Sequence, residues 1–114
     1  MPLDHALDVL WEEHRDRLFM ASLELWVASR TDAELGRTLH RVEREVGDQL
    51  GELAVQALGD IALRPGFKDD LVVVLATIRG LALLGISDEG GGGALAEYWI
   101  HTRAWLVRVL SGDE

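Results

Sequence analysis

The sequence predicts an all-α fold of about five helices that associates with a second copy of itself. Its hydrophobic residues recur at the three- and four-residue spacings of amphipathic helices, and no segment shows the sustained two-residue alternation of a strand. The clearest interruptions are proline and glycine positions, where helices usually end. With 114 residues, of which 48% are hydrophobic and 27% charged, the chain has the size and composition of one folded domain.

Two helices are expected in the N-terminal part of the chain. The first is predicted to begin at Asp4, because aspartate is a favoured N-cap and apolar residues follow it at helical spacing. The charged run 12–17 indicates a solvated face or a corner. The second helix, from about Leu18 to Arg30, is apolar on more than one side, so we expect it to lie centrally.

A long third helix is predicted to follow. Thr31 and Glu34 have the spacing of a capping box, and Asp32 is the alternative N-cap. An apolar stripe then runs from Leu35 to Leu58, with charged residues on the other faces.

Two further helices are expected after the break at 64–67, which reads Arg-Pro-Gly-Phe. The segment Leu71 to Leu84 is apolar nearly all round, and Gly85 is predicted to end it with a left-handed cap. Residues 87–93, which include four consecutive glycines, are expected to form a flexible loop before a last helix at about 94–110.

The last two helices carry more apolar surface than a lone bundle of this size can cover. Leaving that surface in water costs about 25 cal/mol per Å², so we expect a homodimer through residues 67–110, with an interface of about 1,600 Å² or more. The expected dimer-interface residues are Leu75, Arg79, Leu83, Trp99, Thr102, Trp105, Leu106 and Val109. Arg79 interrupts the most apolar helix and must lie at the rim or meet a carboxylate, in this chain or in the partner subunit.

Composition excludes several functions. The formal net charge is −9, with 11 Lys and Arg residues scattered among 20 Asp and Glu residues, so this chain alone is not expected to bind nucleic acid. There are no cysteines for disulfides or thiolate metal sites. The N-terminus lacks a signal-peptide pattern, and the longest apolar stretch is too short to cross a bilayer, so a cytoplasmic protein without membrane contact is expected.

Three segments resemble the C-terminal domain of TetR/AcrR-type transcriptional regulators. These are ASLELWVASRTDAEL at 21–35, VEREVG at 42–47 and PGFKDDLVVVLATIRGLALLG at 65–85. The similarity spans nearly the whole chain, and none of its motifs is catalytic.

This resemblance implies a dimer in which the last two helices of each copy form a four-helix bundle, while residues 4–66 enclose an effector pocket. The DNA-binding helix-turn-helix of such regulators is not found before Asp4, so we expect either a fragment of a longer regulator or a stand-alone relative. A small hydrophobic effector would then control operator binding by a DNA-binding head absent from this chain.

The inward stripes of the first three helices supply the candidate ligand-binding residues. They are Trp11, His14, Phe19, Leu23, Trp26 and Leu39. The same residues would also suit a hydrophobic core, since tryptophan brings bulk and one N–H donor to either role. Glu24 is expected to pair with an arginine at a helix crossing or else to face the pocket.

No catalytic or cofactor-binding motif is present, so neither an enzyme nor a cofactor is expected. Glu97 and His101 share a helix face, but nothing nearby in the sequence completes a metal site, and a surface pair is preferred. The alternative to a ligand sensor is a stand-alone helical protein-interaction module without a ligand. A small all-α enzyme remains a third, less favoured reading.

Overall fold

The computed structural model describes residues 1–85 and 93–112. In these residues the chain forms five α-helices, two short 3₁₀ helices and no strand, so the predicted all-α class is confirmed. The elements are α1 (Leu3–Glu13), α2 (Arg17–Ala28), η1 (Ser29–Thr31), α3 (Ala33–Leu58), η2 (Gly59–Leu63), α4 (Phe67–Leu84) and α5 (Gly93–Ser111).

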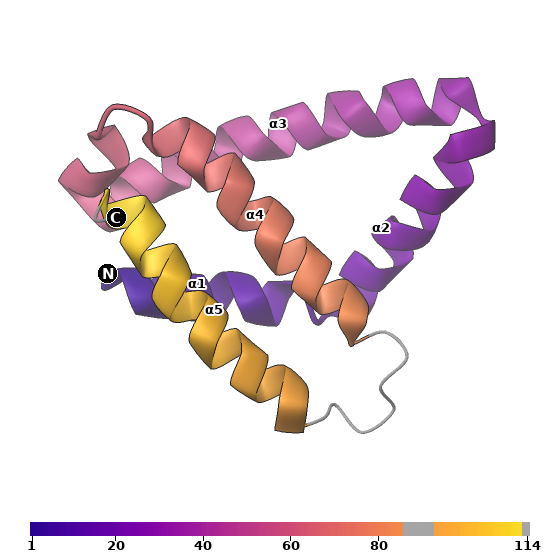
Figure 1. The fold of residues 1–114 in the computed structure, drawn as a ribbon. Helices are drawn as coiled ribbons and strands as arrows, with labels where there is room; N and C mark the ends of the chain where they lie inside the picture. The colour runs from indigo at the N-terminus through magenta and orange to yellow at the C-terminus, as the bar shows by residue number, and fades with distance from the viewer. Residues whose placement is uncertain (86–92, 113–114) are drawn as a thin grey trace.

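Helices α1, α2 and α3 lie along the three sides of a triangle, which α4 crosses from the end of α3 towards the start of α2 (Figure 1). Helix α5 runs back beside α4, so that the N-terminus and the end of α5 lie near each other. Helices α4 and α5 pack against each other and against α1, whereas α2 and α3 meet mainly through η1. The molecule is therefore a three-helix core with an arm made of α2 and α3.

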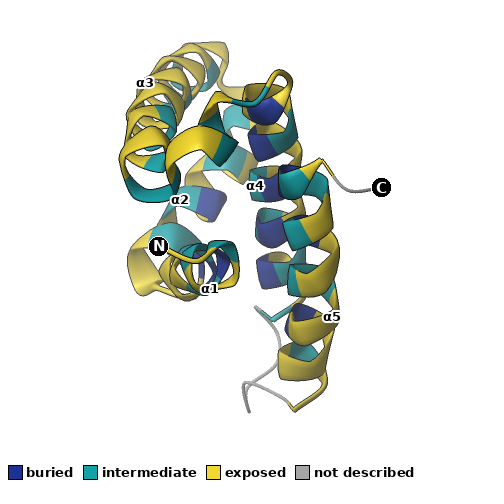
Figure 2. Ribbon diagram, turned by 90° about the vertical axis from the view of Figure 1, so that its left-hand side faces the viewer, coloured by how far each residue is buried: buried dark blue, intermediate teal, exposed yellow. Residues whose placement is uncertain are grey.

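The core lies between α1, α4 and α5, whose buried residues face one another in Figure 2. Leu7, Val74, Ile78 and Leu110 are almost completely buried, and α4 contributes one buried residue at nearly every turn. Helix α3 has no buried residue although it is the longest helix. Burial is thus concentrated on one side of the fold.

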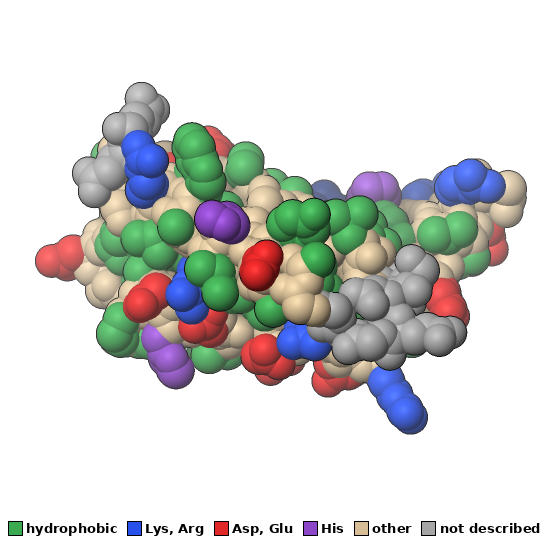
Figure 3. Space-filling model, turned by 60° about the horizontal axis from the view of Figure 1, so that its bottom comes forward, with side chains coloured by type: hydrophobic (Ala, Val, Ile, Leu, Met, Phe, Trp, Pro, Cys, Tyr) green, Lys and Arg blue, Asp and Glu red, His purple; other side chains and the backbone are tan. Residues whose placement is uncertain are grey.

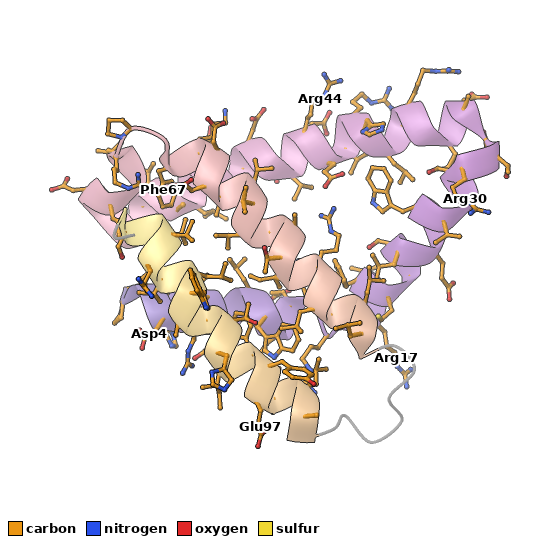
Figure 4. The ribbon with its side chains drawn as sticks, in the orientation of Figure 1. Asp4, Arg17, Arg30, Arg44, Phe67 and Glu97 are labelled. Carbon is orange, nitrogen blue, oxygen red and sulfur yellow. The ribbon has the colours of Figure 1, made fainter. Side chains whose placement is uncertain are left out.

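Side-chain caps fix where α2 and α3 begin. The Oδ1 atom of Asp32 accepts a hydrogen bond of 3.0 Å from the amide of Leu35, which confirms Asp32 rather than Thr31 as the N-cap of α3. Asp16 caps α2 in the same way through the amide of Leu18, so the charged run 12–17 contains the expected corner. The expectation for Asp4 was wrong. Helix α1 begins one residue earlier, after Pro2, and Asp4 points away from the core (Figure 4).

The predicted break at 64–67 is confirmed, and its glycine has the backbone conformation that the break requires. Gly66 has φ of +86° immediately before α4, a left-handed conformation that glycine adopts without a steric penalty. Helix α4 then begins at Phe67, earlier than the sequence predicts, because Phe67 is itself a buried core residue.

Arg64 joins this break to the end of α5. Its Nη2 atom donates to Oδ2 of Asp70 at 2.6 Å, and its Nε atom donates to the carbonyl of Leu110 at 3.3 Å. Carbonyl oxygens in the last turn of a helix have no partner within the helix. Arg64 therefore caps α5 and holds it against the start of α4.

Gly85 was expected to provide a left-handed cap, and this expectation was wrong. Its φ is −84°, in the right-handed region. A Cβ atom built at Gly85 would lie 2.7 Å from Cδ2 of Leu95, so the lack of a side chain lets α5 approach the end of α4 closely. Gly93 belongs to α5, and the rest of the expected flexible loop (87–92) lies outside the described residues.

The folded chain has more surface than a compact protein of its mass. Its accessible surface is 7916 Å², whereas a compact monomer of 12.6 kDa has about 6,200 Å². The radius of gyration is 15.0 Å, compared with about 13 Å for a compact domain of this length. The excess is roughly 1,700 Å², and the exposed large hydrophobic residues on α2, α3, α4 and α5 contribute to it.

Candidate functional site

A groove of about 580 Å³ lies between α3 and α4. Its floor is mostly apolar, and its polar side chains stand at the two ends and along the rim. The lining residues are His40, Glu43, Arg44, Val46, Gly47, Asp48, Leu50 and Gly51 from α3, and Lys68, Leu71, Val72, Leu75, Ala76 and Arg79 from α4.

One ion pair spans this groove. The Nη1 atom of Arg79 on α4 donates a hydrogen bond of 2.8 Å to Oε1 of Glu43 on α3. This confirms that Arg79 meets a carboxylate, and the carboxylate belongs to the same chain. At the other end of the groove, Lys68 and Asp48 are 4.0 Å apart and highly exposed. Arg44 extends outward from α3 at the rim (Figure 4).

Two glycines widen the groove on the α3 side. A Cβ atom built at Gly47 or Gly51 meets no atom within 4 Å, so neither glycine is required by a close contact within the chain. Each glycine costs a helix about 1 kcal/mol relative to alanine. Glu43, Gly47 and Gly51 follow one another at four-residue spacing and therefore share one helix face. In the sequence the pair Gly47 and Gly51 indicates a bend or a close helix crossing. Among the described residues no close crossing is found at either glycine, and both line the groove instead.

The predicted ligand-binding residues are distributed over several places. Trp11 is buried against α5, where its ring stacks on that of Trp99. Leu23 lines a different groove, of about 610 Å³, between α2 and the end of α4. Phe19, Trp26 and Leu39 are half-buried, and Trp26 packs edge-on against His40. Trp11 lines a groove of about 390 Å³ between α1 and α5, and none of these grooves is lined by more than one of the six residues.

His14, the polar member of that set, lies at the end of α1. It is buried, its Nδ1 atom lies 2.7 Å from the carbonyl of Leu10, and its ring centroid is 4.4 Å from that of Phe19. Burial lowers the pKa of His14, and the positive charge of Arg79 lowers it further, against the opposing effects of the Leu10 carbonyl and Glu13. His14 is therefore a neutral core residue whose neighbourhood includes Arg79.

Asp8 organises the contact between α1 and α5. It accepts hydrogen bonds from Nε1 of Trp99 and from Nη1 of Arg103, each at 2.9 Å. The hydrogen bond from Trp99 is the largest cause of the lowered pKa of Asp8. Trp99 and Leu106 were both expected at the dimer interface, but they are 5% and 4% exposed in the single chain and contribute to its own core.

The other expected interface residues divide between two surfaces. Leu75 and Arg79 line the α3–α4 groove, and Leu83 lines the groove next to α2, so these three face the arm. Thr102, Trp105 and Val109 share one stripe of α5, which is half-buried or exposed. The sequence could not indicate which face of α4 points outward, because that helix is apolar nearly all round.

The exposed stripes of α4 and α5 form a surface that we call the outer face. It consists of Val73, Thr77, Gly80 and Leu84 on α4 and Tyr98, Thr102, Trp105 and Val109 on α5. Residues within each stripe are three or four positions apart, and none of them is charged. Leu84 is 66% exposed and Trp105 is 65% exposed. The guanidinium of Arg108 lies over the Trp105 ring at 5.2 Å from its centroid.

Figure 3 shows the molecule with the lower side of Figure 1 turned forward. Hydrophobic side chains lie on this surface in several groups, with histidine, acidic and basic side chains between and around them.

The part of the chain that the structure describes contains no group of three histidine or acidic side chains able to hold a metal ion. Glu97 points into solvent (Figure 4), and His101 is exposed on the same helix. No helix within the described ranges has both the length and the hydrophobicity needed to span a membrane. Glu24 is exposed and makes no salt bridge with another described residue, and it lines the groove between α2 and the end of α4.

Comparison with protein-family models, with curated proteins and with solved structures finds no match to this chain.

Proposed function

We propose that the chain is the ligand-sensing and dimerisation domain of a TetR-type transcriptional regulator. In this proposal a small hydrophobic effector binds the chain and controls operator binding by a DNA-binding head that lies outside this sequence. The resemblance of residues 21–35, 42–47 and 65–85 to such regulators is the reason for naming that class.

The groove between α3 and α4 is the observation that carries the ligand-sensing part. Its volume of about 580 Å³ lies within the range of about 300–1,000 Å³ of small-molecule sites. It also has their usual character, with an apolar floor and a few placed polar groups. Because Arg79 and Glu43 join its two walls, an occupant that disturbs this ion pair would shift α3 relative to α4.

The outer face supports the dimerisation part. The chain exposes roughly 1,700 Å² more surface than a compact monomer, and a standard interface buries about 800 Å² on each partner. A two-fold contact between outer faces would place α4 and α5 of both copies in one four-helix bundle. Effector-induced movement of α3 would then change the relative position of the two DNA-binding heads.

Ligand-dependent thermal stabilisation tests the proposal. A panel of hydrophobic small molecules is screened for an increase in Tm, and binding of the hits is measured by calorimetry on the wild type and on Gly47→Leu. The leucine side chain enters open space in the groove, so this variant should fold and should lose affinity at least tenfold. Gly36→Ala, also on α3 but outside the groove, is the control that should bind normally.

The alternative is a stand-alone helical protein-interaction module, and the exposed outer face is the observation that favours it. In that case no compound would raise the Tm, and a second protein rather than a second copy would cover Trp105. Hits that bind Gly47→Leu as tightly as the wild type would contradict the groove as the ligand site.

A further inference from the structure

We propose that the α3–α4 groove takes an amphipathic anion, an apolar monocarboxylic acid whose carboxylate is held by Arg79. The inference rests on the proposed ligand-sensing function and assigns the chemical class of its ligand.

The guanidinium of Arg79 has N–H donors that form no hydrogen bond with other described residues. An arginine carries five N–H donors, and in the described residues only Nη1 of Arg79 donates to a protein acceptor, Oε1 of Glu43. The side chain is 35% exposed and lines the groove, so its other donors are accessible from there. A planar guanidinium binds a carboxylate through two parallel hydrogen bonds, which is stronger and more specific than one bond.

Glu43 now accepts the hydrogen bond from Arg79 that a ligand carboxylate would accept, and the Glu43 side chain can be displaced. Its side chain is 41% exposed, so it can rotate into water without the penalty of a buried, unpaired charge. A cationic ligand would instead have to displace Arg79 from Glu43. That exchange would leave Arg79 without its carboxylate partner, whereas its positive charge already contributes to the lowered pKa of buried His14.

The charges around the groove favour an anion. Three permanent cations (Arg44, Lys68 and Arg79) line it, against two carboxylates (Glu43 and Asp48). In a chain with a formal net charge of −9, a groove where cations outnumber acids is exceptional. Arg79 is the least exposed of the three cations: its side chain is 35% exposed, whereas Lys68 and Arg44 are exposed.

The apolar floor of the groove can accommodate the hydrocarbon tail of the proposed acid. Leu71 and Leu75 line it from α4 and Leu50 lines it from α3, while Gly47 and Gly51 leave it wide. Lys68 and Arg79 are eleven positions apart on α4, or about 16 Å along the helix axis. The groove therefore offers one anchoring charge followed by an apolar track.

Three ten-carbon probes that differ only in the head group test the assignment. They are decanoate, decanol and decylammonium, each used below its aggregation concentration, with calorimetry on the full chain at neutral pH. Decanoate should bind at least tenfold more tightly than the other two. Arg79→Met keeps the apolar stem and should weaken decanoate at least tenfold while changing decanol less than twofold.

Glu43→Gln discriminates better than Arg79→Met. If the ion pair between Arg79 and Glu43 were only structural, this variant would not bind decanoate more tightly. Removing the competitor should strengthen decanoate binding several-fold, whereas loss of structure would weaken it. Arg15→Met, which removes an arginine outside the groove, should leave all three affinities unchanged.

The outcomes separate this inference from the proposed function. If decanol or decylammonium binds best and Gly47→Leu abolishes that binding, the groove is a ligand site and the acid assignment is overturned. If none of the probes and no compound of the panel binds, both proposals are overturned. Decanoate binding that is unaffected by Arg79→Met and by Glu43→Gln would refute Arg79 as the anchor.

Discussion

Trp11 and Trp99 stack on each other, with ring centroids 4.9 Å apart and planes 7° apart, and so join α1 to α5. The sequence analysis placed Trp11 in a ligand pocket and Trp99 at a dimer interface. In the fold the two rings pack against each other, and Asp8 accepts a hydrogen bond from the indole N–H of Trp99. These three residues hold α1 against α5 within the core.

Trp99→Phe is expected to lower the free energy of unfolding by about 1–3 kcal/mol, because it removes a hydrogen bond to a charged acceptor and part of the ring stack. Urea unfolding followed by circular dichroism measures the change. Trp105→Phe, an equivalent substitution at a tryptophan that is exposed in the single chain, should cost less than about 0.5 kcal/mol when both variants are measured at a protein concentration at which the chain is monomeric. Equal effects of the two substitutions would show that the stack does not stabilise the fold.

A charge on the outer face is expected to prevent self-association. Trp105→Glu and Val73→Glu each replace an uncharged outer-face residue by a carboxylate, and burying that carboxylate between two copies is costly. Sedimentation or light scattering should show a dimer for the wild type and a monomer for both variants. Leu18→Glu changes a leucine on α2 that is even more exposed (79%) and lies outside the outer face, so it should leave the dimer intact. A wild-type protein that stays monomeric at high concentration would rule out the dimer.

His14 is expected to make stability depend on pH. Because burial lowers the pKa of His14 below its ordinary value of 6.5, the unfolded chain takes up a proton at this residue before the folded chain does. The stabilisation is present above pH 6.5 and is lost as the pH falls from 6.5 towards the pKa of the folded state. His14→Phe removes this titration, and the Leu10 carbonyl still accepts the backbone amide of residue 14.

The difference in unfolding free energy, wild type minus His14→Phe, should therefore decrease between pH 7.5 and pH 5. Denaturant titrations at several pH values and one protein concentration provide the measurement. A difference that stays constant or increases over this range would mean that His14 is not held neutral by the fold.

Arg64 is expected to stabilise the end of α5 through several hydrogen bonds at once. Arg64→Leu removes the bonds to Asp70 and to the carbonyls of Val109 and Leu110, and should cost about 2–3 kcal/mol. Arg64→Lys should recover less than half of that loss, because an ammonium group cannot donate in the same fixed directions.

Hydrogen exchange locates the effect of Arg64. Amide protection should fall in the last turns of α5 and at the start of α4, while the middle of α3 stays as in the wild type. Full rescue by Arg64→Lys would contradict the multiple-bond account.

The local features of the fold could be predicted from the sequence. The all-α class follows from hydrophobic spacing, the start of α3 follows from Asp32, and the break before α4 follows from Pro65 and Gly66. Each of these depends on residues a few positions apart, which is the range over which capping and backbone preferences act. The same reasoning failed at Gly85, whose role comes from the approach of Leu95 on another helix.

The tertiary structure alone decided which faces meet. Helix α4 is apolar nearly all round, so its sequence is equally compatible with Leu75 and Arg79 facing a second copy or facing α3. Leu75 and Arg79 line the groove because α3 lies opposite them, and α3 also supplies Glu43, the ion-pair partner of Arg79. In the same way, only the packing of α1 on α5 brings Trp11 to Trp99. Helical periodicity identifies the residues that share a face, but the neighbour that covers that face is set by contacts between residues far apart in the chain.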